Sequence, residues 1–280
     1  MKCVVEFLSS DSLKGRSIGE KGIDESADFI IKEYKSLGLK FFDSTKKSFL
    51  QTFTLPDSIE KYGGIKCNNI VGLIDNKADS SIVIAAHYDH LGNCSPLSKE
   101  VIQLKKCEIH NGADDNASGV SMVLALAKHL TKQKNKKYNY VFVMFSAHEI
   151  GLYGSGFFYE SIFFRDLKIK ALLNFDMVGR LNKSSKSLKT GGFENRKDLQ
   201  KILTTTKACQ SKGLNLLYND EQLLMSDATI FYKNKVSAFT FTTGITEDYH
   251  RSTDESNKIN YEGMKTICGF IIEILAYITK

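Results

Sequence analysis

Apolar strand-like segments alternate with amphipathic helical segments along this chain, and that alternation limits the fold more than any other feature. Residues 140–145 are apolar at every position, as in a strand covered by helices on both faces. Residues 24–37 instead repeat apolar side chains at helical spacing, and Gly38 follows as a helix-end signal. Strands that alternate with helices predict an α/β fold, a three-layer sandwich whose mixed, mostly parallel central sheet is flanked by helices.

The other segments continue the same pattern. Further strands are expected at 49–53, 69–74, 82–86, 171–175 and 237–241, and further helices at 118–130, 197–212 and 261–278. The 280 residues include only two prolines, and no low-complexity linker or internal repeat divides them. We therefore expect a single domain that spans residues 1–280.

Imidazole and carboxylate side chains follow four of the predicted strands, and another carboxylate lies in the polar turn before helix 118–130. Open α/β sheets bind their ligands at the carboxyl ends of the strands, so we expect these side chains to meet in one crevice. A single aspartate after a strand is more often a turn or cap residue, but five such positions together favour a metal site. Nitrogen and oxygen ligands without thiolates suit zinc or a harder divalent ion. The predicted metal ligands are His87, Asp115, Glu149, Asp176 and His250.

The motifs around these positions resemble those of the co-catalytic zinc exopeptidases of clan MH, the group that includes aminopeptidase S and aminopeptidase Y. The resemblance runs nearly from end to end, through residues 7–16, His87-Tyr88-Asp89, 112–119, 148–155, 176–179 and 248–251. It implies a phosphorylase/hydrolase-like fold, two Zn²⁺ ions and a peptide substrate. By that resemblance, His87 and Asp176 bind one zinc ion. Glu149 and His250 bind the other, and Asp115 bridges the pair.

The resemblance gives two more residues a role. Asp89 is expected to orient His87 through the ring nitrogen that does not bind metal. Tyr249 aligns with a tyrosine that, in some members, helps to stabilise the oxyanion of the tetrahedral intermediate. His90, which directly follows Asp89, is expected to be an ordinary polar residue.

One catalytic position departs from the family pattern. The family usually has two adjacent glutamates, of which the first is a general base that takes a proton from the attacking water, and here His148 stands in that place. Three interpretations are open: His148 is the base, it is an inert replacement that leaves little turnover, or it is an additional metal ligand. Two nearby cations would favour neutral imidazole, which accepts protons well. A second departure is Ala228, where the family tends to have a histidine after Ser-Asp.

The sequence thus predicts a metallo-aminopeptidase, a hydrolase that removes N-terminal residues from peptides through a bridged two-metal centre. A dipeptidase, carboxypeptidase or amidase would use the same centre. Two alternatives remain open: a weakly active or inactive metal-binding homologue that acts as an interaction domain, and a glutaminyl-cyclase-like transferase. A zincin is excluded, because Leu152 stands where an HExxH motif that began at His148 would have its second histidine.

Composition argues against nucleic-acid and membrane partners. The 38 basic and 32 acidic residues leave a formal charge of +6, and the densest basic cluster, 132–137, suits the solvated end of helix 118–130. No apolar run approaches the ~18 residues of a membrane span. Residues 1–10 lack an apolar stretch of signal-peptide length, so we expect a cytoplasmic protein, or a secreted or periplasmic one if a leader has been removed. Nothing in the sequence predicts an oligomeric state.

The six cysteines show no CxxC spacing, which argues against a structural zinc knuckle. Most of them are expected to be free thiols. Cys94 and Cys107 bracket the loop between the two halves of the predicted metal site, and a bridge between them is an open alternative that requires an oxidising compartment.

Overall fold

The computed structural model describes residues 1–42, 45, 47–133, 136–161, 164, 166–193 and 197–278. Within these residues, nine strands form one central sheet, and two short strands, β5 (Gly92–Asn93) and β6 (Ile109–His110), form a separate pair. The strands of the central sheet are β1 (Lys40–Phe41), β2 (Leu50–Thr54), β3 (Lys66–Ile74), β4 (Ser81–His87), β7 (Asn139–Phe145), β8 (Ile169–Phe175), β9 (Ser187–Gly191), β10 (Asn215–Tyr218) and β11 (Ala238–Thr242).

The central sheet is mixed, as predicted. Its order is β1-β3-β7-β4-β8-β11-β9-β10, with β2 beside β3. The middle strands β7, β4, β8 and β11 pair in parallel, and so do β9 and β10. The strands β1, β2 and β3 join antiparallel on one side, and β9 joins β11 antiparallel on the other. Parallel pairing therefore aligns the carboxyl ends of the four middle strands at one edge.

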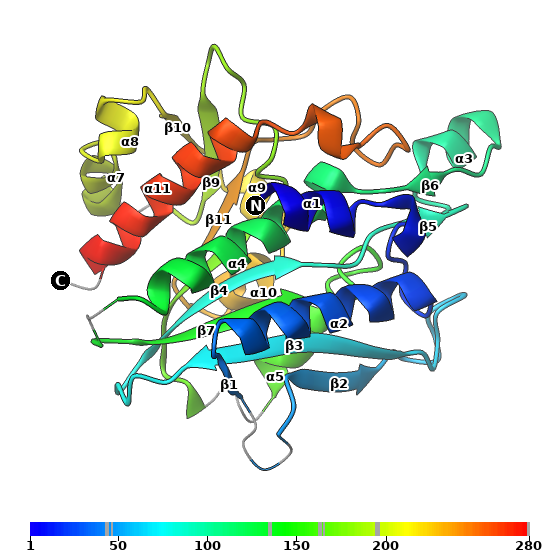
Figure 1. Cartoon of the computed structure of the whole chain (residues 1–280), viewed down its shortest axis with the longest axis horizontal. Coiled ribbons are helices and arrows are strands. Elements are labelled where there is room, and N and C mark those ends of the chain that lie inside the picture. Colours follow the sequence, from blue (N-terminus) through cyan, green and yellow to red (C-terminus); the bar gives the residue numbers. More distant parts are fainter. Residues whose placement is uncertain are drawn as a thin grey trace.

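Helices cover both faces of the sheet, which gives the predicted three layers. The helices are α1 (Lys2–Leu8), η1 (Asp11–Leu13), α2 (Lys21–Ser36), α3 (Lys99–Leu104), η2 (Ala113–Ser118), α4 (Gly119–Leu130), α5 (Tyr153–Glu160), α7 (Lys197–Leu203), α8 (Lys207–Gln210), α9 (Glu221–Leu224), α10 (Ala228–Lys233), η3 (Ser256–Lys258) and α11 (Tyr261–Ile278). Figure 1 shows α2, α4 and α11 across the near face, with α5 and α10 behind the sheet.

Strand alternation divides the core between the two faces. On β4, Ile84 belongs to the buried cluster that includes Phe270 of α11, whereas Val83 belongs to the cluster that includes Phe231 of α10. Every residue of β4 is buried, as expected for a central strand between two helical layers. The largely apolar sequences of the middle strands follow from this double burial.

The element boundaries differ from the predictions mainly in the last third of the chain. The predicted helix at 197–212 is divided into α7 and α8, and the side chain of Thr206 caps the second helix by accepting from the backbone of Cys209. The short elements β9, β10, α9 and α10 were not predicted. Part of the basic cluster 132–137 lies outside the described residues. No helix in the described part of the chain is both long and apolar enough to cross a membrane.

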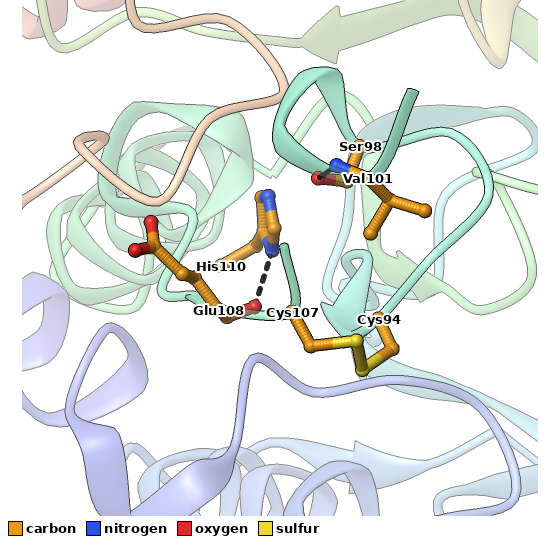
Figure 2. Close-up of a disulfide and its surroundings, with 6 residues drawn as sticks. All are labelled: Cys94, Ser98, Val101, Cys107, Glu108 and His110. Atoms are coloured by element: carbon orange, nitrogen blue, oxygen red, sulfur yellow. Dashed lines mark hydrogen bonds between the residues drawn. A yellow bond between two sulfur atoms is a disulfide. The ribbon is translucent and has the colours of Figure 1, made fainter. Parts of the chain in front are cut away.

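A disulfide joins Cys94 to Cys107, which decides the alternative that the sequence left open. Figure 2 shows the bridge at the base of the loop that carries Ser98 and Val101. The other cysteines, Cys3, Cys67, Cys209 and Cys268, are free thiols, as expected.

Candidate metal centre

The five predicted ligands come together at the carboxyl edge of the sheet. His87 is the last residue of β4, Asp176 directly follows β8, and Glu149 lies in the turn after β7. His250 lies in the long segment after β11, and Asp115 lies in η2, just before α4. All five therefore occupy strand ends or the helix entry that faces them, as expected for a binding crevice of an open α/β sheet.

Asp115 stands between two groups of side chains. Its Oδ1 lies 3.4 Å from Nε2 of His87, which also lies 3.6 Å from Oδ1 of Asp176. Its Oδ2 lies 3.5 Å from Nε2 of His250, which also lies 3.3 Å from Oε2 of Glu149. Each oxygen of this one carboxylate thus faces a different imidazole and a different second carboxylate.

These separations fit ligand atoms that share a cation. Four ligands held tetrahedrally at the usual zinc distances lie about 3.3 Å from one another. The Nε2 atoms of His87 and His250 are buried and make no hydrogen bond within the described part of the structure, although buried polar atoms normally have a partner. The donor set and its geometry therefore fit divalent cations at two adjacent positions.

The carboxylates give this crevice a field that favours cations. Burial opposes the charged form of His87, but Asp115 and Asp176 outweigh it and hold the pKa of His87 well above its usual value. Burial opposes the charged form of His250 as well, yet Asp115 and Glu149 raise the pKa of His250 to about 10. Metal ions would take the place of these protons, so metal binding here must compete with protonation.

Backbone hydrogen bonds fix the turn that carries Asp115. The peptide bond between Asp115 and Asn116 is cis. The carboxylate of Asp254 accepts a hydrogen bond from the backbone N–H of Asp115 at 3.0 Å. The side chain of Asn116 donates to the carbonyl of Phe175 at 2.9 Å and accepts from the N–H of Met177 at 3.1 Å. These last two bonds tie the turn directly to the segment that carries Asp176.

Asp89 supports the site differently from the expectation. The ring Nδ1 of His87 lies 3.2 Å from the backbone carbonyl of Asp89 and 3.8 Å from its carboxylate. The carboxylate instead accepts hydrogen bonds from the backbone N–H groups of His148 and Glu149, both at 3.2 Å. The backbone of Asp89 therefore contacts the imidazole more closely, and its side chain positions the turn that carries Glu149.

His90 contributes to the site, although the sequence predicted an ordinary polar residue at this position. It is buried, and its Nδ1 lies 2.8 Å from Oε1 of Glu149 and 3.8 Å from Oδ2 of Asp115. A hydrogen bond to Oε1 leaves Oε2 of Glu149 directed to His250. The one sequence signal for His90 was its position three residues after His87, close to a predicted ligand. That position did not predict the role, because the sequence does not show whether the chain after the strand turns toward the site or away from it.

His148 is held by Asp227, a residue to which the sequence motifs gave no role. Its Nδ1 lies 2.9 Å from Oδ2 of Asp227, which is completely buried just before α10. The ring stacks on that of His87, with centroids 3.7 Å apart and planes inclined by 6°. Its other nitrogen, Nε2, lies 4.0 Å from Oδ2 of Asp176. Burial and the nearby His87 lower the pKa of His148, but the carboxylates of Asp227 and Asp176 have the larger effect. The net result is a pKa raised to about 9.

A cavity of about 50 Å³ opens onto the centre, and Tyr249 forms part of its wall. The ring of Tyr249 also stacks against His250, with centroids 3.9 Å apart. Burial holds the pKa of the Tyr249 phenol far above its usual value, so the group keeps its proton at neutral pH. Ala228, which replaces the family's usual histidine, is buried at the start of α10 beside Asp227.

Comparison with known families agrees with this arrangement. The sequence profile described as "Peptidase family M28" matches residues 69–275, a range that includes all five candidate ligands. The chain belongs to peptidase family M28. This assignment agrees with the resemblance to clan MH exopeptidases that the motifs indicated.

Curated proteins similar to this M28 chain are fungal leucine aminopeptidases. A "Probable leucine aminopeptidase" of Arthroderma otae is 28% identical over 130 residues, which are 44% of this chain and 32% of the relative. "Leucine aminopeptidase 2" of Trichophyton equinum is 32% identical over 117 residues, 41% of this chain and 22% of the relative. The matched segments thus span a third or less of these relatives.

Solved structures with the same fold align with nearly the whole M28 chain. A leucine aminopeptidase precursor from Bacteroides thetaiotaomicron gives a TM-score of 0.75 at 16% identity, with 97% of this chain and 94% of that chain covered. A glutaminyl cyclase from Porphyromonas gingivalis gives a TM-score of 0.77 at 17% identity, with 99% and 96% covered. A Zn-dependent exopeptidase from Parabacteroides distasonis gives 0.75 at 15% identity, with 98% and 95% covered. At these identities the likeness establishes the fold alone.

Proposed function

We propose that this M28 chain is a zinc aminopeptidase that removes N-terminal residues from peptides at a two-metal centre. The observation that carries the proposal is the position of Asp115, whose two oxygens lie 3.4 Å from His87 and 3.5 Å from His250. A carboxylate so placed is suited to bridge two cations. The family assignment and the names of the fungal relatives support peptide hydrolysis from the amino end.

Two zinc ions, when bound, supply Lewis acidity that polarises a scissile carbonyl and makes water acidic enough to act as a nucleophile near neutral pH. His87 and Asp176 would hold one ion, and Glu149 and His250 the other. The hydrogen bond from His90 would keep one oxygen of Glu149 directed to its ion. Asp115 would be shared by both.

His148 would accept the proton of the attacking water and later deliver it to the leaving amine. Its Nδ1 is engaged by Asp227 at 2.9 Å, so Nε2 is the nitrogen that faces the crevice. The charges of two bound cations would lower the raised pKa of His148 and leave Nε2 free to accept a proton. A carboxylate that fixes the tautomer and direction of an imidazole is the arrangement used in hydrolytic triads. This geometry favours the base interpretation of His148 over an inert replacement.

Tyr249 would stabilise the negative charge that develops on the carbonyl oxygen. It lines the cavity together with Asp176 and Glu149, and its phenol stays protonated at neutral pH because burial raises its pKa. A neutral O–H donor held in a partly buried site can stabilise an oxyanion without rearranging during the reaction.

We also propose that the protein functions in an oxidising compartment. The Cys94–Cys107 disulfide closes a loop that includes α3. This loop contacts the site through the backbone N–H of Lys99, which donates to the carbonyl of His250 at 3.1 Å. Structural disulfides persist in oxidising environments and are rare in the cytosol. This favours the secreted or periplasmic alternative of the two locations expected from the sequence.

The deciding experiment combines metal analysis with a substrate panel. The purified protein should retain two zinc ions per chain and hydrolyse aminoacyl-4-nitroanilides with a free amino group, but not their N-acetylated forms. Free dipeptides test the dipeptidase alternative, and peptides with a blocked amino end and a free carboxyl end test the carboxypeptidase alternative. Peptides that begin with glutamine test for cyclisation. If the folded protein binds fewer than two ions, the two-metal centre is rejected. If it binds two ions but hydrolyses none of the substrates, the aminopeptidase function is rejected in favour of the interaction domain.

A further inference from the structure

A fully buried arginine lies in the segment between η1 and α2, close to the proposed metal centre. Arg16 is 1% exposed, and its guanidinium donates to four backbone carbonyls. Nε donates to Tyr88 at 2.9 Å, Nη1 to Asn111 at 2.6 Å and Nη2 to Gly112 at 3.0 Å. Nη1 also donates to Leu8, the last residue of α1. One side chain therefore joins the end of α1, the segment after β4 and the segment before η2.

Two of these segments carry proposed metal ligands. Tyr88 directly follows His87, and Gly112 begins the turn that carries Asp115. A guanidinium is planar and its N–H groups have a fixed geometry, so the carbonyls that share it are held at a fixed separation. Arg16 therefore helps to set the distance of 3.4 Å between Nε2 of His87 and Oδ1 of Asp115.

The backbone of Arg16 holds the segment after β4 a second time. Its carbonyl accepts from the N–H of His90 at 3.2 Å. The carbonyl of Gly15 accepts from the N–H of Gly92 in β5 at 3.0 Å, which keeps the chain after η1 beside β5 (Figure 1). The side chain of His90 in turn lies 2.8 Å from Glu149. The contacts of Arg16 thus extend to ligands of both proposed ions.

The backbone that presents Arg16 is strained. Lys14, Gly15 and Arg16 have φ angles of 50°, 73° and 51°, all in the left-handed region. Residues with a Cβ adopt this region at a cost in free energy, and they remain there only where their surroundings hold them, often at functional sites. A Cβ at Gly15 would lie 2.4 Å from the carbonyl oxygen of His110, so this close approach requires glycine. The strain is consistent with a segment whose contacts are needed by the site.

The charge of Arg16 alone does not explain its place. Burial lowers its pKa to about 10, while nearby carboxylates, first Asp115 and Asp254, oppose that shift. The group is therefore a cation at neutral pH. A cation buried beside a site for cations opposes metal binding by its charge, and burying it is itself unfavourable. The compensating gain must come from the geometry that its hydrogen bonds impose.

We propose that Arg16 is a positioning residue, which fixes the segment of His87 relative to the turn of Asp115 and so preforms the two-cation site before metal binds. This inference rests on the proposed two-metal centre, but it does not require that centre to be catalytic. Lysine cannot replace the arginine, because an ammonium group is a point charge on a flexible stem and does not span the same carbonyls. Arg16→Lys therefore keeps the charge and removes the fixed geometry.

Leu13 offers a matched control in the same part of the chain. It is 1% exposed and belongs to the main core cluster, and its side chain has no hydrogen-bonding group. Leu13→Ala should destabilise the fold by leaving a cavity, without releasing either ligand-bearing segment. A lower melting temperature that both variants share is a structural effect, whereas an effect confined to Arg16→Lys reports positioning.

Hydrogen exchange on the metal-free chain tests whether the site is preformed. In the native chain, peptides covering residues 85–92 and 110–118 should exchange about as slowly as the buried strand β7. Arg16→Lys should speed up exchange in both peptides by about tenfold or more, the effect of losing a hydrogen bond from a charged donor, and Leu13→Ala should not. Arg16→Gln is the second variant if Arg16→Lys does not fold. If both native peptides exchange rapidly and become protected only when zinc is added, the metal orders the ligands and the proposal is wrong.

Titration with Co²⁺ tests the consequence for metal binding without turnover, because the visible absorption of the bound ion reports its coordination geometry. The native chain should bind two ions. Arg16→Lys should bind at least one of them about 10- to 100-fold more weakly, the usual effect of losing a group that orients metal ligands, and should change the absorption spectrum. Leu13→Ala should match the native chain. Unchanged affinity and spectrum in Arg16→Lys, or equal changes in both variants, would overturn the positioning role.

These measurements separate the positioning role from the proposed function. If the native chain hydrolyses no peptide, but exchange and Co²⁺ binding change in Arg16→Lys alone, the positioning role stands and the aminopeptidase function fails. If the native chain is an active aminopeptidase and Arg16→Lys keeps its exchange rates and its Co²⁺ affinity, only the positioning role is wrong.

Discussion

Asp227 holds the imidazole of His148 through a contact of 2.9 Å between its Oδ2 and Nδ1. The two residues lie 79 positions apart in the chain and meet because α10 packs behind the sheet near the turn after β7. The contact leaves Nε2 of His148 directed to Asp176. An oriented imidazole thus occupies the place in which the family usually has a glutamate.

Replacement of His148 should separate its three interpretations. If it is the base, His148→Ala should lower kcat by about 10²- to 10⁴-fold, the usual contribution of a general base, while both zinc ions stay bound. His148→Glu should recover part of the rate. Measured metal content and steady-state kinetics on the same samples give the answer. Loss of an ion in His148→Ala would support the ligand interpretation, and unchanged kcat would support the inert one.

Asp227→Asn should reduce kcat while leaving KM and the metal content nearly unchanged. An asparagine keeps the size of the side chain, but it no longer stabilises the imidazolium that forms when His148 accepts a proton. The double variant His148→Ala/Asp227→Asn should be no slower than His148→Ala alone, since Asp227 acts through the imidazole. If the two substitutions lower kcat additively in the double variant, Asp227 supports the site in some way other than through His148.

Asp115→Asn should reduce the bound metal from two ions to one or none. The two oxygens of Asp115 face different imidazoles, and an asparagine has a single oxygen to offer. Asp114→Asn is the matched control, because Asp114 accepts from the backbone of Gly179 at 2.7 Å and makes no contact with His87 or His250 in the described structure. Elemental analysis after dialysis measures both variants. Two retained ions in Asp115→Asn would rule out the bridging role.

Reduction of the Cys94–Cys107 disulfide should lower the free energy of unfolding by up to about 3 kcal/mol, the loop-closure contribution of a bridge of this span. The reduced loop should also hold His250 less firmly, since Lys99 of α3 donates to the His250 carbonyl. Urea denaturation of Cys94→Ser/Cys107→Ser, compared with the exposed free-thiol variant Cys3→Ser, measures the first effect. Equal stability of the two variants would show that the bridge is dispensable.

The strand-end residues could be predicted because their signal is local. Apolar runs that end in a histidine or aspartate identify both the strand and its terminus, and parallel pairing of the middle strands brings those termini to one edge. The structure brings His87, Glu149 and Asp176 together in this way. The mixed sheet with helices on both faces followed from the same alternation.

The remaining contributors depend on contacts that no local pattern reveals. His90 and Asp227 act through hydrogen bonds to residues 59 and 79 positions away. Asp89 illustrates the same limit, because its carboxylate lies near His87 but accepts a hydrogen bond from the backbone of the turn after β7, the neighbouring strand in the sheet. The short strands β9 and β10 were missed since their sequences mix polar and apolar residues, and their pairing partners define them.

A carboxylate far from the metal centre should make stability depend on pH. The side chain of Lys77, with further help from Lys40, lowers the pKa of Asp75 to about 2. A carboxyl whose folded pKa is depressed stabilises the fold above its ordinary pKa, and that contribution disappears as the pH falls from about 4 toward 2. Asp75→Asn should therefore cost less than about 1 kcal/mol at pH 7, as partly exposed ion pairs do, and progressively less in acid. Urea denaturation of the metal-free protein between pH 7 and pH 3 measures this, with Asp79→Asn, an exposed carboxylate of the same loop, as control. A difference between Asp75→Asn and the native chain that persists unchanged to pH 3 would show that the ion pair does not contribute.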